Sequence, residues 1–277
     1  MSGLNLIASY PKSGNTWVRA VLTSLNQGGG PLDINRLGVP IASERPFFDD
    51  ALEIETSDLL LAEEHRLRPL AYQTVLANGG PLTLKTHDAW LPAPGAEALP
   101  FPPKDITMVI LIVRDPRDVA LSMATYYDMP VDEAIHALGS TSFMMGINHQ
   151  GLRPQLPQYV SSWSRHTDSW LSSELPLHLV RYEDMIAAPL ESFAAIAAAL
   201  KEPASPADIA AAVAAARFDR MQSAEKTKGF RESSPQAPNR FFRSGKAGGW
   251  RQTLTSAQVD RILRDHGPTI QRLGYEV

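Results

Sequence analysis

Four short segments of this chain have residue types and spacing suited to binding an anion and moving a proton. The first is YPKSGNTW at residues 10–17, where Lys12 stands inside a turn between an apolar run and a helical pattern. The free N–H groups and the dipole of a helix start favour an anion, and Lys12 adds a full positive charge. Ser13 and Thr16 add hydroxyl donors, and Gly14 allows close approach of the backbone. The alternative is an ordinary turn with a surface lysine.

The second segment is VRDPRD at residues 113–118, which follows an apolar run. Arg114 comes where that run ends, and the carboxyl ends of strands are where doubly wound α/β folds bind ligands. Its planar fork of donors suits a phosphate, and Ser122 lies two helical turns further on. Arg114 could instead pair with Asp115 or Asp118, and for Arg117 we favour such pairing.

The third and fourth segments are KTH at residues 85–87 and RSGKAGGWR at residues 243–251. His87 could act as a general base, because its ordinary pKa lets it accept a proton at neutral pH, although a lone histidine is more often structural. In the fourth segment, glycines around basic residues favour a loop that closes over an anion. A disordered basic loop is the alternative.

The elements that would position these segments alternate between strands and helices. Apolar runs predict strands over 4–10, 82–86, 108–113 and 177–181, and the run at 108–113 is as apolar as a strand buried on both faces. Helical spacing is predicted from residue 16, after Asp115-Pro116, and over 57–77, 130–138, 158–173, 189–201, 206–217 and 256–265, with a long loop over 222–250. We expect one three-layer α/β domain over residues 1–277, with a central parallel sheet flanked by helices.

Composition limits the classes of function. The 277 residues carry a formal charge of −4 and no cysteine, which argues against a nucleic-acid-binding face and excludes disulfides and cysteine-ligated metals. No run approaches the roughly 20 apolar residues of a membrane-spanning helix, and the first residues do not resemble a signal peptide. We therefore expect a cytoplasmic protein with no membrane span.

Taken together and in this order, the segments resemble the cytosolic-type sulfotransferases, which use 3′-phosphoadenosine 5′-phosphosulfate (PAPS). In that family YPKSGTTW holds the 5′-phosphosulfate, an arginine and a serine eight residues later hold the 3′-phosphate, and KTH carries the base. The RYEDM and RSGKAGGWR segments resemble the family's adenosine-side tyrosine and closing loop. The resemblance implies a P-loop-like nucleotide-binding core in which the donor is bound by Lys12, Ser13, Gly14, Asn15, Thr16, Trp17, Arg114, Ser122, Tyr182, Phe218, Arg243, Ser244 and Gly245.

The same resemblance implies transfer of a sulfuryl group to an acceptor hydroxyl. His87 would take the acceptor's proton, Lys12 would face the leaving phosphate, and Lys85 would face the sulfuryl group. No metal is required, because fixed lysines replace the magnesium of phosphoryl transfer. Departures from the family pattern are Asn15, Ser244, Ala216 and Gly249.

The acceptor is the least specified part of this hypothesis. Aromatic residues in several segments could line an apolar pocket, which favours a small phenol or hydrophobic alcohol; they are Phe47, Phe48, Trp90, Tyr126, Tyr127, Phe143 and, with them, Met144. Two alternatives remain: a P-loop-type small-molecule or nucleoside kinase that uses Asp115 for magnesium, and a non-catalytic nucleotide-binding protein. The sequence does not specify the oligomeric state.

Overall fold

The computed structural model describes residues 3–79, 82–147, 154–233 and 241–277. The chain folds into two compact units. The first unit comprises residues 1–10, 40–111 and 140–178, and the second comprises residues 11–39, 112–139 and 179–277. The division falls directly before Pro11, so Tyr10 and Lys12 of the first motif belong to different units. That residues 1–277 form one domain stays a prediction.

The central sheet has the strand order β2-β1-β3-β6. Its strands are β1 (Leu4–Ser9), β2 (Leu82–Thr86), β3 (Ile106–Val113) and β6 (Leu177–Arg181). β1 and β2 pair in parallel, from Leu4 opposite Leu82 to Ala8 opposite Thr86. The sequence predicted all four strands, with small differences at their ends. Because β1 and β2 are parallel, Ser9 and Thr86 end at the same edge of the sheet.

The apolar side chains of β1 and β3 form much of the core. Residues 109–113 of β3 are all buried, which is why this run is continuously apolar rather than alternating. A separate antiparallel pair joins β4 (Met144–Met145) to β5 (Gln158–Tyr159).

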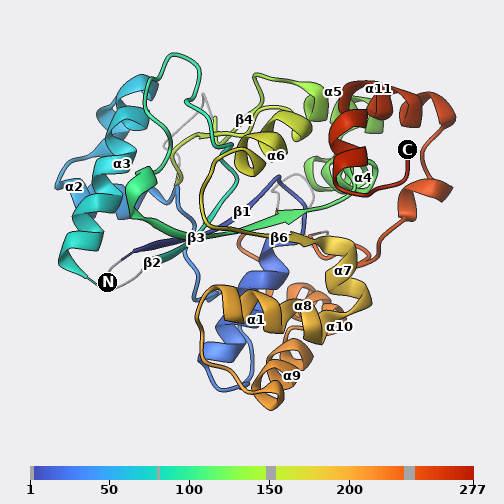
Figure 1. Cartoon of the computed structure of the whole chain (residues 1–277), viewed down its shortest axis with the longest axis horizontal. Helices are drawn as coiled ribbons and strands as arrows, with labels where there is room; N and C mark the ends of the chain where they lie inside the picture. The colour runs from blue at the N-terminus through green and yellow to red at the C-terminus, as the bar shows by residue number, and fades with distance from the viewer. Residues whose placement is uncertain (1–2, 80–81, 148–153, 234–240) are drawn as a thin grey trace. The chain divides into compact units, whose positions relative to one another are not determined.

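The first unit contains α2 (Arg45–Leu52), α3 (Leu61–Asn78) and α6 (Trp163–Leu171), with 3-10 turns at Thr56–Asp58 and Pro103–Asp105. α2 and α3 lie side by side (Figure 1), where the rings of Phe48 and Tyr72 are 5.5 Å apart. Tyr72 also stacks on Phe101 at 4.9 Å. Phe48 is 1% exposed, so it belongs to this aromatic core and does not line an open pocket.

The second unit contains eight α-helices among its described residues. They are α1 (Asn15–Asn26), α4 (Pro116–Tyr127), α5 (Val131–Gly139), α7 (Tyr182–Ala187), α8 (Pro189–Ala199), α9 (Pro206–Ala215), α10 (Phe218–Lys228) and α11 (Ser256–Arg272), with a 3-10 turn at Gly249–Gln252. Local capping sets several starts. The Asp115 carboxylate accepts the N–H of Arg117 at the start of α4, and capping boxes begin α9 at Ser205 and α11 at Thr255.

Several predicted boundaries of helices and loops were wrong. The helix predicted over 158–173 begins at Trp163, because the N–H groups of Val160 and Ser161 both bond to Phe143 O and Ser161 is left-handed with φ of 63°. The loop predicted from residue 222 begins after Lys228, where α10 ends. α11 continues past Gly267-Pro268 to Arg272, because Thr269 and Ile270 extend its buried face.

In the described residues, no helix is both long enough and apolar enough to cross a membrane.

Candidate active site

The YPKSGNTW turn is built by two left-handed residues. Lys12 has φ of 67° and Gly14 has φ of 104°, and α1 begins directly afterwards at Asn15. A Cβ atom on Gly14 would lie 2.6 Å from Cδ2 of Tyr182, so only glycine fits here. Ser13 is fully buried, and its Oγ has no hydrogen-bond partner in the described chain. The turn therefore offers an unused hydroxyl at a helix N-terminus, which is a donor set for an anion.

Arg114 braces this turn. Its Nη1 donates to the backbone oxygen of Lys12 at 3.0 Å, and its Nη2 donates to that of Lys246 at 3.1 Å. The guanidinium lies 4.4 Å from the centre of the Tyr182 ring. Nε of Arg114 is buried without a partner among the described residues. Arg114 thus connects three of the segments that the resemblance assigned to the nucleotide.

The acidic neighbours of Arg114 have other partners. The Asp115 carboxylate accepts two N–H groups of the Arg117 side chain at 2.9 and 2.8 Å. The Asp118 carboxylate accepts Gly248 N–H at 2.6 Å and Trp250 N–H at 3.0 Å. The pairing that we favoured for Arg117 is confirmed.

The closing loop, residues 241–251, packs on Phe218, one of the residues predicted for the adenosine. Gly245 has φ of 60°, and a Cβ there would lie 2.5 Å from the Phe218 ring. Arg243 is exposed and Ser244 is half-buried. Trp17 lies against Phe193 with ring centres 5.2 Å apart, and against Tyr182 at 6.3 Å.

Four further predicted site residues are buried or half-buried on the elements that carry them. Asn15 is buried and Thr16 half-buried in the first turn of α1, and Ser122 is half-buried on α4. Lys85 is 6% exposed, and its backbone bonds to Pro40 and Ala42 while it pairs in register with Ile7.

His87 lies in the first unit, directly after β2. Its Nδ1 is 2.7 Å from the backbone oxygen of Ser9 and 3.3 Å from the Ser9 hydroxyl. A carbonyl oxygen accepts a hydrogen bond and cannot donate one, so the proton of the neutral imidazole is on Nδ1. Nε2 then carries the lone pair, which is the arrangement a general base requires. His87 N–H donates to the Gln158 side chain at 3.0 Å, and this bond fixes the backbone of the loop.

Asp88, the residue after His87, forms a buried ion pair with Arg68. Both terminal nitrogens of Arg68 donate to Asp88, at 3.1 and 2.6 Å. The same carboxylate accepts the Thr86 hydroxyl at 3.0 Å and Tyr159 N–H at 2.9 Å. With four donors, the charge of Asp88 is fully compensated in the interior.

Burial lowers the pKa of two histidines of the first unit, His166 and His65. Burial lowers the pKa of His166 to about 4, because a charged ring loses its hydration there. Burial, and then the Arg68 guanidinium, lower the pKa of His65 to about 4. The His166 ring packs edge-on against Tyr10 at 5.6 Å.

Sequence reasoning missed the supporting roles of Arg68, Asp88, Asp118, Glu225 and Phe241. Asp88 directly follows the KTH segment, and Asp118 lies within VRDPRD, where it was considered only as a partner of Arg114; that placement was the available signal. Glu225 has no local signal: it is 0% exposed and accepts the N–H groups of Phe241 and Phe242 at 2.9 and 3.0 Å.

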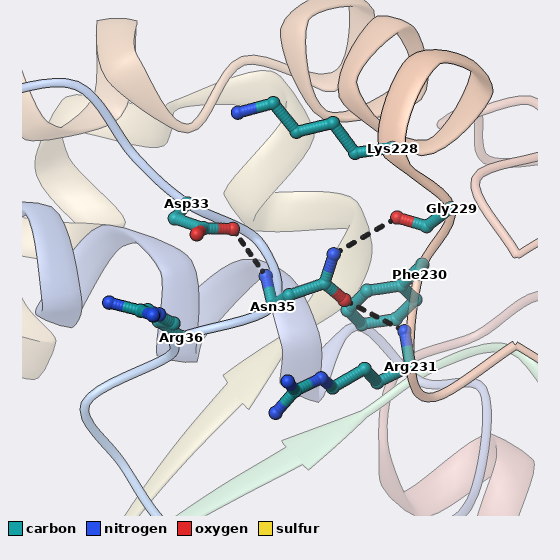
Figure 2. Close-up of a pocket in the computed structure, with 7 residues that line it drawn as sticks. All are labelled: Asp33, Asn35, Arg36, Lys228, Gly229, Phe230 and Arg231. Carbon is teal, nitrogen blue, oxygen red and sulfur yellow. Dashed lines mark hydrogen bonds between the residues drawn. The ribbon is translucent and has the colours of Figure 1, made fainter.

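A separate open pocket lies where the loop after α1 meets the end of α10 (Figure 2). Asn35 joins the two segments: its Nδ2 donates to Gly229 O at 3.1 Å and its Oδ1 accepts Arg231 N–H at 2.8 Å. Arg36, Lys228 and Arg231 line this pocket, and none of the predicted site residues does.

Comparison with known proteins agrees with the geometry. A family model described as "Sulfotransferase domain" matches residues 5–274. Sulfotransferase 1A1 of dog is 26% identical over 97% of this chain and 84% of its own, and flavonol 3-sulfotransferase of Flaveria bidentis is 26% identical over 92% and 78%.

Solved structures share the fold. The mouse sulfotransferase SULT7A1 complexed with PAP aligns with a TM-score of 0.61 at 18% identity, covering 97% of this chain and 84% of that one. Retinol dehydratase in complex with androsterone and PAP aligns with a TM-score of 0.60 at 17% identity, covering 96% and 80%. The chain therefore has a P-loop-like α/β fold with a central sheet flanked by helices. The chain belongs to the sulfotransferase family.

Proposed function

We propose that this sulfotransferase takes its sulfuryl group from PAPS and transfers it to the hydroxyl of a small phenol or hydrophobic alcohol. The observation that carries the proposal is the donor set at the Lys12 turn. Buried Ser13 Oγ has no partner in the described chain, Gly14 leaves no room for a side chain, and Arg114 braces the turn. These groups suit a phosphosulfate. Relatives named for flavonol and retinol, and complexes titled with PAP, support the choice of donor and acceptor class.

The donor would be held by residues of the second unit. The 5′-phosphosulfate would be bound by Lys12, Ser13, Asn15 and Thr16. The 3′-phosphate would be bound by Arg114, Ser122, Arg243, Ser244 and Gly245. Trp17, Tyr182 and Phe218 meet the adenosine. Bound donor supplies the sulfuryl group, and everything else in the reaction is done by side chains of this chain.

In the proposed reaction, Nε2 of His87 takes the proton of the acceptor hydroxyl as its oxygen bonds to sulfur. Lys12 stabilises the charge that appears on the phosphate oxygen when its bond to sulfur breaks, and Lys85 stabilises the sulfuryl oxygens. Ser9, whose carbonyl holds the imidazole, precedes Lys12 by three residues.

Of the alternatives, the kinase is not favoured. It assigned Asp115 to magnesium, but that carboxylate already accepts the N–H of Arg117 and two N–H groups of its side chain. A cytoplasmic location stays a prediction.

The test compares His87→Asn with His136→Asn. Asparagine keeps a donor for Ser9 O but has no group at the place of Nε2, and His136 is an exposed histidine on α5. Sulfate transfer from radiolabelled PAPS into a panel of phenols and alcohols gives turnover, and calorimetry with adenosine 3′,5′-bisphosphate gives binding. We expect His87→Asn to lose roughly 10²–10⁴-fold in kcat with binding unchanged, and His136→Asn to match wild type.

Two results would contradict this. Turnover of His87→Asn near that of wild type removes His87 from the base role. A wild-type chain that transfers no sulfate and prefers Mg-ATP to the bisphosphate removes the whole proposal.

A further inference from the structure

The ammonium group of Lys12 lies between the faces of two aromatic rings. Its Nζ is 4.0 Å from the centre of the Tyr126 ring and 3.7 Å from the centre of the Phe241 ring. Both distances are well inside the roughly 6 Å within which a ring face attracts a cation. The two rings stand at 82° to each other, with centres 5.8 Å apart, so they form two walls of a cage.

Each wall is fixed by contacts of its own. The Tyr126 hydroxyl donates to the backbone oxygen of Glu232 at 2.9 Å. Phe241 N–H donates to the buried carboxylate of Glu225 at 2.9 Å, and the Phe241 ring packs against Phe230 at 4.7 Å. The rings therefore do not depend on Lys12 for their positions.

The backbone of Lys12 is fixed as well. Its φ of 67° is a left-handed value that non-glycine residues seldom adopt, and its carbonyl accepts the Arg114 bond.

From this geometry we propose that Tyr126 and Phe241 are positioning residues for Lys12, and the inference rests on the proposed function. A carboxylate would also hold the ammonium, but it would neutralise the charge and compete with the phosphosulfate. A ring face attracts the cation and leaves its full charge for an incoming anion. The lysine is thereby placed before the donor binds.

Through Phe241, the closing loop also contacts the Lys12 turn. Phe241 lies in the loop whose Lys246 carbonyl accepts the Arg114 bond. The closing loop therefore contacts Arg114 through the Lys246 carbonyl and Lys12 through the Phe241 ring.

The sharpest test changes the ring's electronic character and keeps its shape. Phenylalanine with one, two and three ring fluorines at position 241 weakens the negative face step by step. We expect affinity for adenosine 3′,5′-bisphosphate and kcat with PAPS to fall in the same order, by about three- to tenfold across the series. In a Lys12→Met background the series should be flat.

Conventional variants and a direct probe complete the test. Phe241→Leu should lower both affinity for the bisphosphate and kcat with PAPS, and Phe241→Tyr, which keeps a ring face at this position, should restore them. The ε-methylene protons of Lys12 should resonate upfield from ring currents and return toward normal values in Phe241→Leu.

The outcomes separate the two proposals. A flat fluorine series in an enzyme that transfers sulfate overturns the cage and leaves the proposed function intact. Normal Lys12 resonances in the wild type also overturn the cage. If the chain transfers no sulfate, upfield resonances still support the cage, since the NMR measurement needs no activity.

Discussion

Removing Arg68 should destabilise this protein far more than removing an exposed arginine of a similar pair. Arg68 and Asp88 are 0% and 1% exposed, and two N–H groups of Arg68 contact the carboxylate. Arg68→Met leaves the Asp88 charge buried with the Thr86 hydroxyl and Tyr159 N–H as its remaining donors. Such a loss typically costs about 3–5 kcal/mol. Against a total stability of roughly 5–15 kcal/mol, that is a large fraction.

Urea unfolding and thermal scans measure the effect. At about 2–4 °C per kcal/mol for a chain of this size, Tm should fall by about 6–20 °C. The matched control is Arg217→Met, since Arg217 also pairs with an aspartate but the two side chains are 63% and 64% exposed. An exposed pair contributes little to stability, because water screens the two charges.

A double variant tests the cause. Arg68→Met with Asp88→Asn removes the buried charge, so it should recover at least about 2 kcal/mol of the loss. The reasoning is refuted if Arg68→Met costs no more than Arg217→Met, or if the double variant is as unstable as the single one.

Three further predictions concern the site and its surroundings. Gly14→Ala should lower affinity for adenosine 3′,5′-bisphosphate at least about tenfold by calorimetry, because its Cβ would lie 2.6 Å from Tyr182 at φ of 104°; unchanged affinity would show that the turn adapts. Asp118→Ala leaves two loop N–H groups without their acceptor and should cost about 1–3 kcal/mol in urea unfolding; a cost near zero would mean that water replaces the carboxylate. The pKa of His166 is lowered to about 4, so the unfolded chain binds the extra proton and stability falls as pH drops from 6.5 toward 4. His166→Phe should make the urea midpoint fall less between pH 6.5 and 5, and an equally steep fall would assign the loss to other groups.

β1 and β3 could be predicted from the sequence because burial on both faces leaves a continuous apolar run. Residues 109–113 of β3 show this directly. The start of α4 was readable because Asp115-Pro116 is a local capping signal. α10 was not readable, since Met221 and Glu225 are its only buried residues and a polar helix has no apolar period to detect.

Part of the candidate site could be predicted from the sequence for a related reason. Lys12, Arg114 and His87 stand at strand ends, and strand ends follow from the apolar pattern. The contacts that hold them come from distant parts of the chain. Arg68 is 20 residues from Asp88, and Phe241 is more than 200 residues from Lys12. No local pattern encodes such pairs, so the supporting residues required the folded chain.

The Asp118 carboxylate shapes the closing loop through peptide N–H groups at residues 248 and 250. Every amino acid except proline supplies that donor, so these two hydrogen bonds do not themselves require particular side chains at residues 248 and 250. Ser244 and Gly249, the two departures from the family pattern in this loop, therefore leave both hydrogen bonds in place. A library of loop variants should tolerate most replacements at position 249 and reject proline at position 250.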